Sequence, residues 1–486
     1  MTCNTHFSNA RAGESRSELR AAPRMTRSPK GRSRRFGLAI GVVMGLALSA
    51  PAAWAETLTD TLIDAYRHSH LLEQNRALLR ATDEDVALAV ASLRPVLNFV
   101  ASANRSFPLP VTAIDVINAA VELQASVTLY DGGANRIAVD QTKETVLATR
   151  EALVAVEQSV LLSAVQAYTD VQSAKQLVSL RQSNTRLITE QLRAARDRFE
   201  VGEITRTEVA AAEARLAAAN SSFAAAEGQL EYAREAFKLA VGRAPGTLAD
   251  APPTPDIPNT LDAAKKIATR THPAIRQAQR EVTVTELGVL RAEAAMKPSV
   301  NANASIAMDK YGDRSGAFGL NLSQPIYAGG ALSSAVRQAK AQRDANRSNL
   351  LQTVHEVEQA AGNAWATLAV AIAQLDATER QISAAQIAFN GVREEAGLGA
   401  RTTLDVLDAE QDLLDARVDR VDAVAAQYVA IYSLLSAMGL LTVDHLKLGI
   451  QTYDPSAYYN AVKTAPAGLS QQGRKLDAVL ERLGKR

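Results

Sequence analysis

Few residues of this sequence have the types and the spacing that would let them do chemistry. His68 and His70, in the stretch HSH, could bind a metal ion, but no further cysteine or histidine cluster lies nearby, so a surface pair is the simpler interpretation. The only cysteine is Cys3, and the sequence has no Ser/His/Asp arrangement, Walker loop or dinucleotide fingerprint. The sequence therefore predicts no catalytic residue, no cofactor and no metal site, and an enzyme is the least favoured class of function.

Two carboxylates in the second half of the chain share one face of an expected helix. Asp405 and Asp408 are three residues apart, and Arg401 precedes them. Taken alone, they would be ordinary solvated residues or helix caps after a turn. Over the whole chain, 53 basic and 52 acidic residues nearly cancel, so nothing indicates binding to nucleic acid. The aromatic content of 5% and the many alanines fit long helices better than a large globular core.

Residues 1–55 have the pattern of a secretory signal peptide. Basic residues precede an apolar run at 36–50, and the sequence AWA at 53–55 is a cleavage site, which places the mature start at Glu56. The apolar run is shorter than the ~18 residues of a transmembrane helix. Because the basic segment is unusually long, Met25 is an alternative translation start.

The rest of the sequence contains one unit twice. The first copy has the corner Tyr130, Gly132 and Gly133, and the second copy has Tyr327, Gly329 and Gly330, each 197 positions later. The same offset aligns residues 126–242 with 323–439 without a gap, and a proline-rich linker at 245–258 separates the units. This regularity indicates a tandem duplication.

Each unit begins with two segments whose apolar and polar residues alternate. The expected strands are 96–104, 121–129, 299–308 and 318–323, and they pair as two hairpins. In 121–129 the odd positions from Val121 to Leu129 are apolar and the even positions are polar. A length of about ten residues matches a β-strand that crosses a bilayer. Four strands cannot close a barrel, so several chains are expected to share one.

A long helical pattern follows each Gly-Gly pair. A helix from about 134 to 198 is expected in the first unit. Its heptad seam of apolar residues is interrupted by Glu157 and Arg181, and the second unit has the same seam. A second helix follows Gly202 in the first unit and Gly399 in the second. Residues 199–205 and 396–402 are therefore expected to form the tips of two antiparallel helical hairpins.

The repeated corner lies where an alternating strand becomes a helix. Tyrosine anchors at the membrane interface, and glycine allows the positive φ of a sharp turn. The corner therefore predicts the place where a membrane strand continues into a helix outside the membrane. The alternative is a strand-to-helix turn in a soluble protein.

The expected fold is mainly α with a membrane β part, built from a duplicated unit. The expected segments are a signal peptide (1–55), a first-repeat N-terminal helix (56–94), a membrane β-hairpin (95–130), a helical hairpin (131–245), a linker with the second-repeat N-terminal helix (246–297), a second membrane β-hairpin (298–328), a second helical hairpin (329–441) and a C-terminal periplasmic tail (442–486).

Together the duplicated corners and the tip sequences FEVGEITRTEV and LGARTTLDVLDAE resemble the TolC family of outer-membrane export ducts, over roughly residues 56–455. The resemblance implies a homotrimer in the cell outer membrane, with a large periplasmic portion. Its twelve-stranded β-barrel, in contact with lipid, would continue as an α-helical barrel. It also implies a periplasmic adaptor and an inner-membrane ABC or proton-driven pump as partners, and no catalysis.

The resemblance also assigns roles to residues at the hairpin tips. A periplasmic gate would include Arg401, Asp405, Asp408 and Glu208, the last being the first-repeat counterpart of Asp405. Adaptor-docking tips would be Val201, Gly202, Leu398 and Gly399. The family often has a tyrosine near the position of Ala396, so the sequence leaves the completeness of the gate links open.

Three other functions compete with this interpretation. A periplasmic adaptor also has a long coiled-coil hairpin, but it usually has one hairpin and no set of four amphipathic strands. A soluble coiled-coil scaffold would leave the alternating strands without a purpose, and an enzyme ranks last. The cargo is not determined by the sequence. The long tail, with YDPSAYYNAV at 453–462, favours protein secretion or mixed duties over drug efflux alone.

Overall fold

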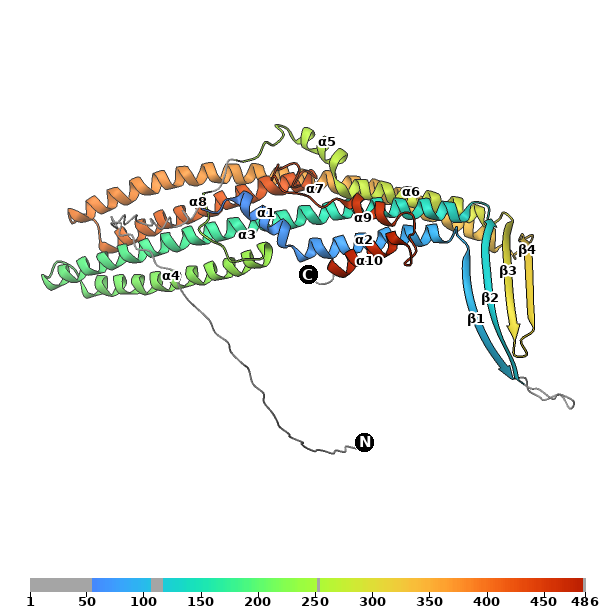
Figure 1. Ribbon diagram of the computed structural model, residues 1–486. Helices are drawn as coiled ribbons and strands as arrows, with labels where there is room; N and C mark the ends of the chain where they lie inside the picture. The colour runs from blue at the N-terminus through green and yellow to red at the C-terminus, as the bar shows by residue number, and fades with distance from the viewer. Residues whose placement is uncertain (1–54, 106–116, 251–253, 484–486) are drawn as a thin grey trace, which may run out of the picture. The chain divides into compact units, whose positions relative to one another are not determined.

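The computed structural model describes residues 55–105, 117–250 and 254–483, and the expected signal peptide lies outside these residues except for its last position. The first repeat consists of α1 (Leu58–His68), α2 (His70–Ala91), β1 (Val96–Arg105), β2 (Ile117–Tyr130), α3 (Ala134–Glu200) and α4 (Arg206–Val241). The second consists of α5 (Leu261–Thr271), α6 (Pro273–Ala294), β3 (Ser299–Asp309), β4 (Arg314–Ser323), α7 (Ala331–Gly397) and α8 (Thr403–Ala437). The tail contains α9 (Pro455–Val462) and α10 (Gln471–Leu483) (Figure 1). Within the described residues, none of the helices is long and apolar enough to cross a membrane.

The N-terminal part of each repeat is two helices, where the sequence indicated one. Ser69 ends α1 in an extended conformation, and its side chain accepts a hydrogen bond from the backbone N–H of Leu72 at the start of α2. In the second repeat, Pro273 is the first residue of α6, and a proline there starts a new helix more easily than it continues an old one. Local capping therefore divides both N-terminal segments.

The four strands form one antiparallel sheet in the order β1-β2-β3-β4. The β2–β3 pairing joins the two repeats, and it places Leu123 opposite Ile306 and Gln124 opposite Ser305. Because directly opposed residues share a face, the apolar positions of β2, β3 and β4 lie on one side and the polar positions on the other, and β1 departs from this pattern at Val96 and Val100, which lie opposite Ser126 and Glu122. The expected alternation is therefore present in the sheet, and its register keeps the two faces distinct.

The ends of β2 and β4 differ from the expected pattern. The ladder shifts between Thr128 and Tyr130, so Tyr130 pairs with Val300 on the apolar face and Leu129 is the extra residue of an irregularity. Tyr327 does not end a strand, because β4 stops at Ser323, opposite Ser299, where the neighbouring strand β3 begins.

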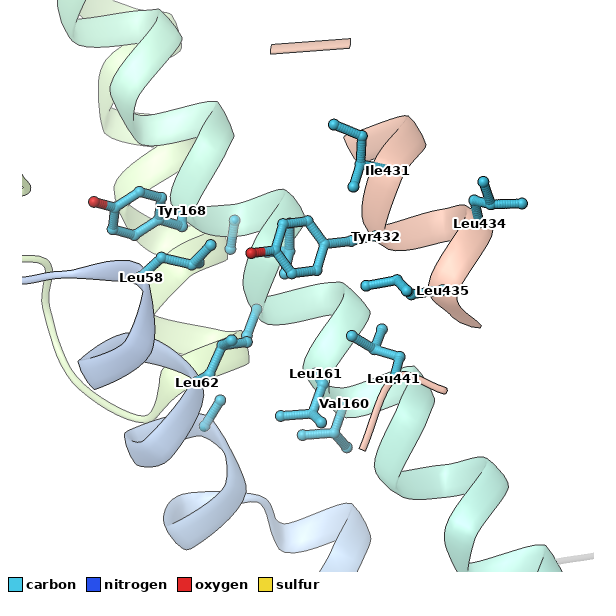
Figure 2. Close-up of a cluster of buried hydrophobic side chains, with 14 of the residues drawn as sticks. Leu58, Leu62, Val160, Leu161, Tyr168, Ile431, Tyr432, Leu434, Leu435 and Leu441 are labelled. Carbon is cyan, nitrogen blue, oxygen red and sulfur yellow. The ribbon is translucent and has the colours of Figure 1, made fainter. Parts of the chain in front are cut away.

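The main hydrophobic core joins both repeats. Leu58 of α1 and Tyr168 of α3 lie in one cluster with Leu435 of α8, and all three are almost fully buried (Figure 2). The Tyr168 hydroxyl donates a hydrogen bond to the carbonyl oxygen of Ala249, 2.7 Å away, in the segment that links the repeats. This core fixes α3 against helices from both halves of the chain.

The seam of α3 accommodates one of its two charged interruptions by a backbone contact. Val160, Ala164 and Val171 are buried as the heptad pattern predicts. The carboxylate of Glu157 accepts a hydrogen bond from the backbone N–H of Val443, 2.7 Å away. Burial nevertheless raises the pKa of Glu157 above its usual range. A carboxyl group at this position therefore connects the helical core to the segment that follows α8.

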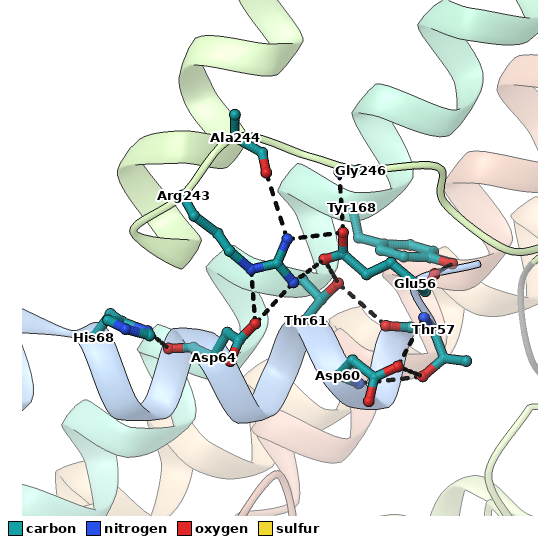
Figure 3. A network of polar contacts seen from close by, with 10 residues as sticks. All are labelled: Glu56, Thr57, Asp60, Thr61, Asp64, His68, Tyr168, Arg243, Ala244 and Gly246. Atoms are coloured by element: carbon teal, nitrogen blue, oxygen red, sulfur yellow. Dashed lines mark hydrogen bonds and ion pairs between the residues drawn. The ribbon is translucent and has the colours of Figure 1, made fainter. Parts of the chain in front are cut away.

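The segment that enters α1 is held by an ion-pair network (Figure 3). Arg243 donates hydrogen bonds to both carboxylate oxygens of Glu56, at 2.8 and 3.0 Å, and its Nε donates to Asp64 at 2.8 Å. The Thr61 hydroxyl and the backbone N–H of Gly246 also donate to Glu56. Hydrogen bonding to Glu56 raises the pKa of Arg243 further. This network joins the start of α1 to the end of α4.

The C-terminal tail lies along the first repeat, where α9 packs against α2. Arg94 donates hydrogen bonds to the backbone carbonyls of Thr464 and Ala465, and Arg150 donates to the carbonyl of Pro455. The Arg150 guanidinium also lies 5.3 Å from the centre of the Tyr459 ring, within reach of a cation–π contact. Arg94, which follows α2, and Arg150, on α3, thus hold the tail in place.

Candidate functional site at the hairpin tips

The two helical hairpins turn through the same backbone structure. Gly202 and Gly399 both have φ of +80°, a conformation that side chains other than glycine's rarely adopt. The backbone N–H of Glu203 bonds to the carbonyl of Arg198 at 2.9 Å, and the N–H of Ala400 bonds to that of Glu395 at the same distance. The duplication therefore extends to the hydrogen bonds of the tips.

The second helix of each hairpin begins with a capping box. Asp405 accepts hydrogen bonds from the backbone N–H and the hydroxyl of Thr402, both at 2.9 Å, and the Thr402 hydroxyl accepts from the N–H of Asp405. Glu208 has the same relation to Thr205, with longer contacts of 3.4 Å. The bond from the Thr402 backbone N–H is the main reason that the pKa of Asp405 lies below its usual range. In the single chain, these two acids thus act as helix caps.

The remaining two gate candidates form ion pairs. Arg401 donates from Nε to Glu395 at 2.8 Å, across the turn of its own hairpin, and this bond raises the pKa of Arg401. Asp408 pairs with Arg215 of α4, which belongs to the other hairpin. The structure therefore brings Arg401 near Asp405 at one tip and uses Asp408 to connect the two hairpins, while Glu208 lies at the other tip.

A second polar link between the hairpins was not anticipated from the sequence. Glu410 of α8 is only 4% exposed, and its Oε1 accepts a hydrogen bond from the side-chain amide of Asn184 on α3, 3.0 Å away. Its other oxygen is buried without a hydrogen-bond partner. Burial raises the pKa of Glu410 to about 7, against the opposing effect of Asn184. The available signal was a carboxylate between the seam residues Leu407 and Leu414.

Apolar contacts surround these polar links. Leu407 of α8 packs against Ile188 and Leu192 of α3, so the hairpins also meet through side-chain packing. Ala396, where the sequence resemblance led us to expect a tyrosine, packs beside Phe389 in a cluster within the second hairpin. In this chain, Asp408 and Glu410 make polar links between the two hairpins, whereas Ala396 makes an apolar contact.

The adaptor-docking candidates are strongly exposed at the tips. Val201 is 71% exposed and Leu398 is 88% exposed, although both are apolar. A Cβ atom added to Gly202 or Gly399 would meet no atom within 4 Å. Each tip thus presents one apolar side chain beside an uncovered glycine.

The strand-to-helix corners use glycine in different ways. Gly132 and Gly133 have φ of +68° and +91°, and a Cβ on Gly132 would lie 2.8 Å from the Ala294 carbonyl oxygen. Asp131 accepts hydrogen bonds from the backbone N–H groups of Gly133 and Asn135. Gly329 and Gly330 have similar angles, but open space surrounds them. Tyr130 is half exposed at the end of β2, and Tyr327 is 89% exposed after β4.

The two histidines lie at the α1–α2 break. A ring nitrogen of His68 lies 2.9 Å from the carbonyl oxygen of Asp64, one turn earlier in α1. Among the residues that the structure describes, no group of three or more histidine, cysteine or acidic side chains is placed to hold a metal ion. The contact of His68 with the Asp64 carbonyl therefore lies within α1.

These features define a class of protein. It is a duplicated chain in which an amphipathic four-stranded sheet continues through glycine corners into two long helical hairpins. The model of the family described as "Outer membrane efflux protein" matches residues 62–243 and 266–440. The chain belongs to this family, which works in the outer membrane and is not a family of enzymes.

Individual relatives agree with this assignment. The chain is 36% identical over 435 residues to the outer membrane efflux protein BepC of Brucella suis, covering 88% of this chain and 95% of BepC. It is 24% identical over 415 residues to the proteases secretion protein PrtF of Dickeya chrysanthemi, covering 78% and 87%. The solved structure of CusC superimposes with a TM-score of 0.72 at 21% identity, covering 79% of this chain and 92% of CusC, which shows a shared fold.

Proposed function

We propose that three copies of this chain assemble into an exit duct of a tripartite export system. The observation that carries the proposal is the sheet, which has one apolar face and two edge strands, β1 and β4. Unpaired strand edges are not tolerated in lipid, so the edges must pair with those of neighbouring copies. Three four-stranded sheets would give a twelve-stranded barrel, and the helical hairpins would continue it as a tunnel through the periplasm.

The proposed partners would bind the tips of the helical hairpins, at the end away from the sheet. The exposed apolar residues Val201 and Leu398, each beside an open glycine, support docking of a periplasmic adaptor. The adaptor would connect the duct to an inner-membrane ABC or proton-driven pump, and the duct itself would catalyse nothing. Cargo would include proteins, in keeping with the name of the proteases secretion protein PrtF.

The assembly can be tested on outer membranes extracted with detergent. We expect trimers that resist dissociation on mild heating and that form channels in planar lipid bilayers. A protein that stays monomeric in detergent, or trimers without conductance, would contradict the proposed duct.

The docking role of the tips predicts a separate effect. Gly399→Trp puts a bulky side chain where the φ of +80° and the surrounding space now suit glycine. We expect trimers to form as before but export and adaptor cross-linking to fall. The matched variant Gly391→Ala, within α7, should leave both unchanged. Normal export by Gly399→Trp would rule out docking at this tip.

The gate is the second part of the proposal. In a trimer, Asp405 and Asp408 would place six carboxylates around the axis, where they would attract cations and repel anions. Carboxylate oxygens would also bind multivalent cations. Arg401 and Glu208 would support this constriction through the contacts that order the tips. The duct is therefore expected to conduct cations selectively and to be blocked by multivalent cations from the periplasmic side.

Asparagine substitutions test the gate with little change of shape. Asp405→Asn with Asp408→Asn keeps an acceptor for Thr402 and Arg215 but removes the charges. Cation selectivity and the block should both weaken in bilayer recordings. Asp262→Asn, an exposed acid at the start of α5, is the matched control and should conduct like the unmodified protein. Unchanged block in the double variant would show that these aspartates do not line the constriction.

A further inference from the structure

The two long helices are equivalent in the repeat but differ in how much of their surface is covered. Helices α3 and α7 both have 67 residues, yet seventeen residues of α3 are buried and only six of α7 are. Within the described residues, α3 packs against α6 and α8 of the second repeat as well as helices of its own, whereas the extensive contacts of α7 are with α5, α6 and α8, all from its own repeat. The face of α7 that corresponds to the α8-covered face of α3 is therefore open.

A specific pair of polar residues marks the covered face. Inside the chain, Glu410 of α8 is buried and accepts a hydrogen bond from Asn184 of α3. Shifted by the repeat offset of 197, these positions are Glu213 of α4 and Gln381 of α7, so a carboxylate and a side-chain amide recur. Both are exposed in the single chain. The second repeat thus carries the amide, on Gln381, and the first repeat carries the carboxylate, on Glu213. The single chain does not bring these two side chains together.

We propose that Glu213 of one copy binds Gln381 of a second copy, as Glu410 binds Asn184 within the chain. The inference rests on the proposed assembly and assigns a polar contact to the surface between its subunits. Helix α4 of one copy would cover α7 of the next in the way that α8 covers α3. The occupant of the open face is therefore this chain itself.

The present partner of Glu213 fits this assignment. Glu213 accepts a bond from Arg196 of the same hairpin, 2.6 Å away, while both side chains remain at least half exposed. In the second repeat, Arg393 occupies the position equivalent to Arg196, yet the hydrogen bond of Glu410 comes from Asn184 on α3, in the neighbouring hairpin. Once a second helix covers this position, the glutamate bonds to the amide of that helix.

Cysteine cross-linking tests the contact directly. In a Cys3→Ser background no other cysteine is present, so Glu213→Cys with Gln381→Cys introduces the only thiols. We expect a short bifunctional maleimide to link these residues between chains and to give covalent dimers and trimers. The matched pair Asn184→Cys with Glu410→Cys calibrates the reach of the reagent, because it should link within one chain.

The outcomes separate this inference from the proposed duct. Intact trimers in which the control pair reacts and the test pair gives no product between chains would overturn the contact while leaving the duct in place. Protein that is monomeric before cross-linking would overturn both proposals.

A charge exchange gives an independent readout. Gln381→Glu would place two carboxylates against each other, so the temperature at which trimers dissociate should fall, and adding Glu213→Gln should restore it. Arg196→Ala should leave that temperature close to the unmodified value. A loss in Gln381→Glu that Glu213→Gln does not relieve would overturn the proposed contact.

Discussion

Replacing Glu410 by glutamine should make the helical part of the protein more stable at alkaline pH. The amide oxygen of glutamine can still accept the hydrogen bond from Asn184, which now reaches Oε1 at 3.0 Å. What the substitution removes is the negative charge that develops when Glu410 loses its proton. Because the side chain is 4% exposed and one of its oxygens has no partner, that charge is costly in the folded chain.

The magnitude follows from the difference in pKa between the two states. Burial raises the pKa of Glu410 from 4.5 to about 7. The unfolded chain therefore releases this proton first, and the free energy of unfolding falls as the pH rises through this interval, then stays level above it. At ~1.4 kcal/mol for each pKa unit, the full loss is roughly 3 kcal/mol per chain. Glu410→Gln should avoid that loss and should resemble the unmodified protein below the interval.

Thermal unfolding followed by far-UV circular dichroism, from about pH 4.5 to about pH 9, measures this difference. The unfolding temperature of Glu410→Gln should exceed that of the unmodified protein only in the alkaline part of the range. Asp412→Asn removes an exposed carboxylate two residues further along the same helix and serves as the control. The reasoning is refuted if the difference between Glu410→Gln and the unmodified protein is the same at every pH.

Two further substitutions test the corner and the sheet. Gly132→Ala should destabilise the protein more than Gly329→Ala in urea unfolding, because only a Cβ at position 132 would lie 2.8 Å from the Ala294 carbonyl oxygen. Equal losses of unfolding free energy would contradict a steric role for that contact. On the apolar side of the sheet, which we propose faces lipid, Ala304→Arg should cost ~2–4 kcal/mol and lower the yield of trimers, whereas Asn303→Arg on the opposite face should mainly alter conduction. Equal yields of trimers would contradict the assignment of the two faces.

Much of the fold could be predicted because its signals are periodic and occur twice. The alternation of residues 121–129 and the heptads after each Gly-Gly pair indicated the four strands and the long helices that the structure contains. The sequence did not predict the breaks at Ser69 and Pro273, because each depends on one capping or ring-constrained residue within an otherwise helical pattern. It also predicted that the corner at Tyr327 follows a strand directly, whereas β4 stops at Ser323, opposite the first residue of β3.

The tips could be located from the sequence, but their contacts could not. Gly202 and Gly399 marked the turns, and both have the positive φ that the turns require. The pairing of Asp408 with Arg215 and of Glu410 with Asn184 depends on how one hairpin lies against the other. Because those partners are distant in sequence, no local pattern indicates them.

The contacts that hold the C-terminal tail have a consequence for how this segment can change over time. Arg94 and Arg150 bind backbone carbonyls of Thr464, Ala465 and Pro455, groups that every amino acid possesses. Thr464 and Ala465 can therefore exchange their side chains without losing these bonds, whereas Tyr458 and Tyr459 are held through their side chains, by Glu84 and by the Arg150 guanidinium. Residues bound through their backbone alone are therefore free to diverge between related chains, while the tyrosines of α9 are constrained to remain side chains that fit the same surface of the first repeat.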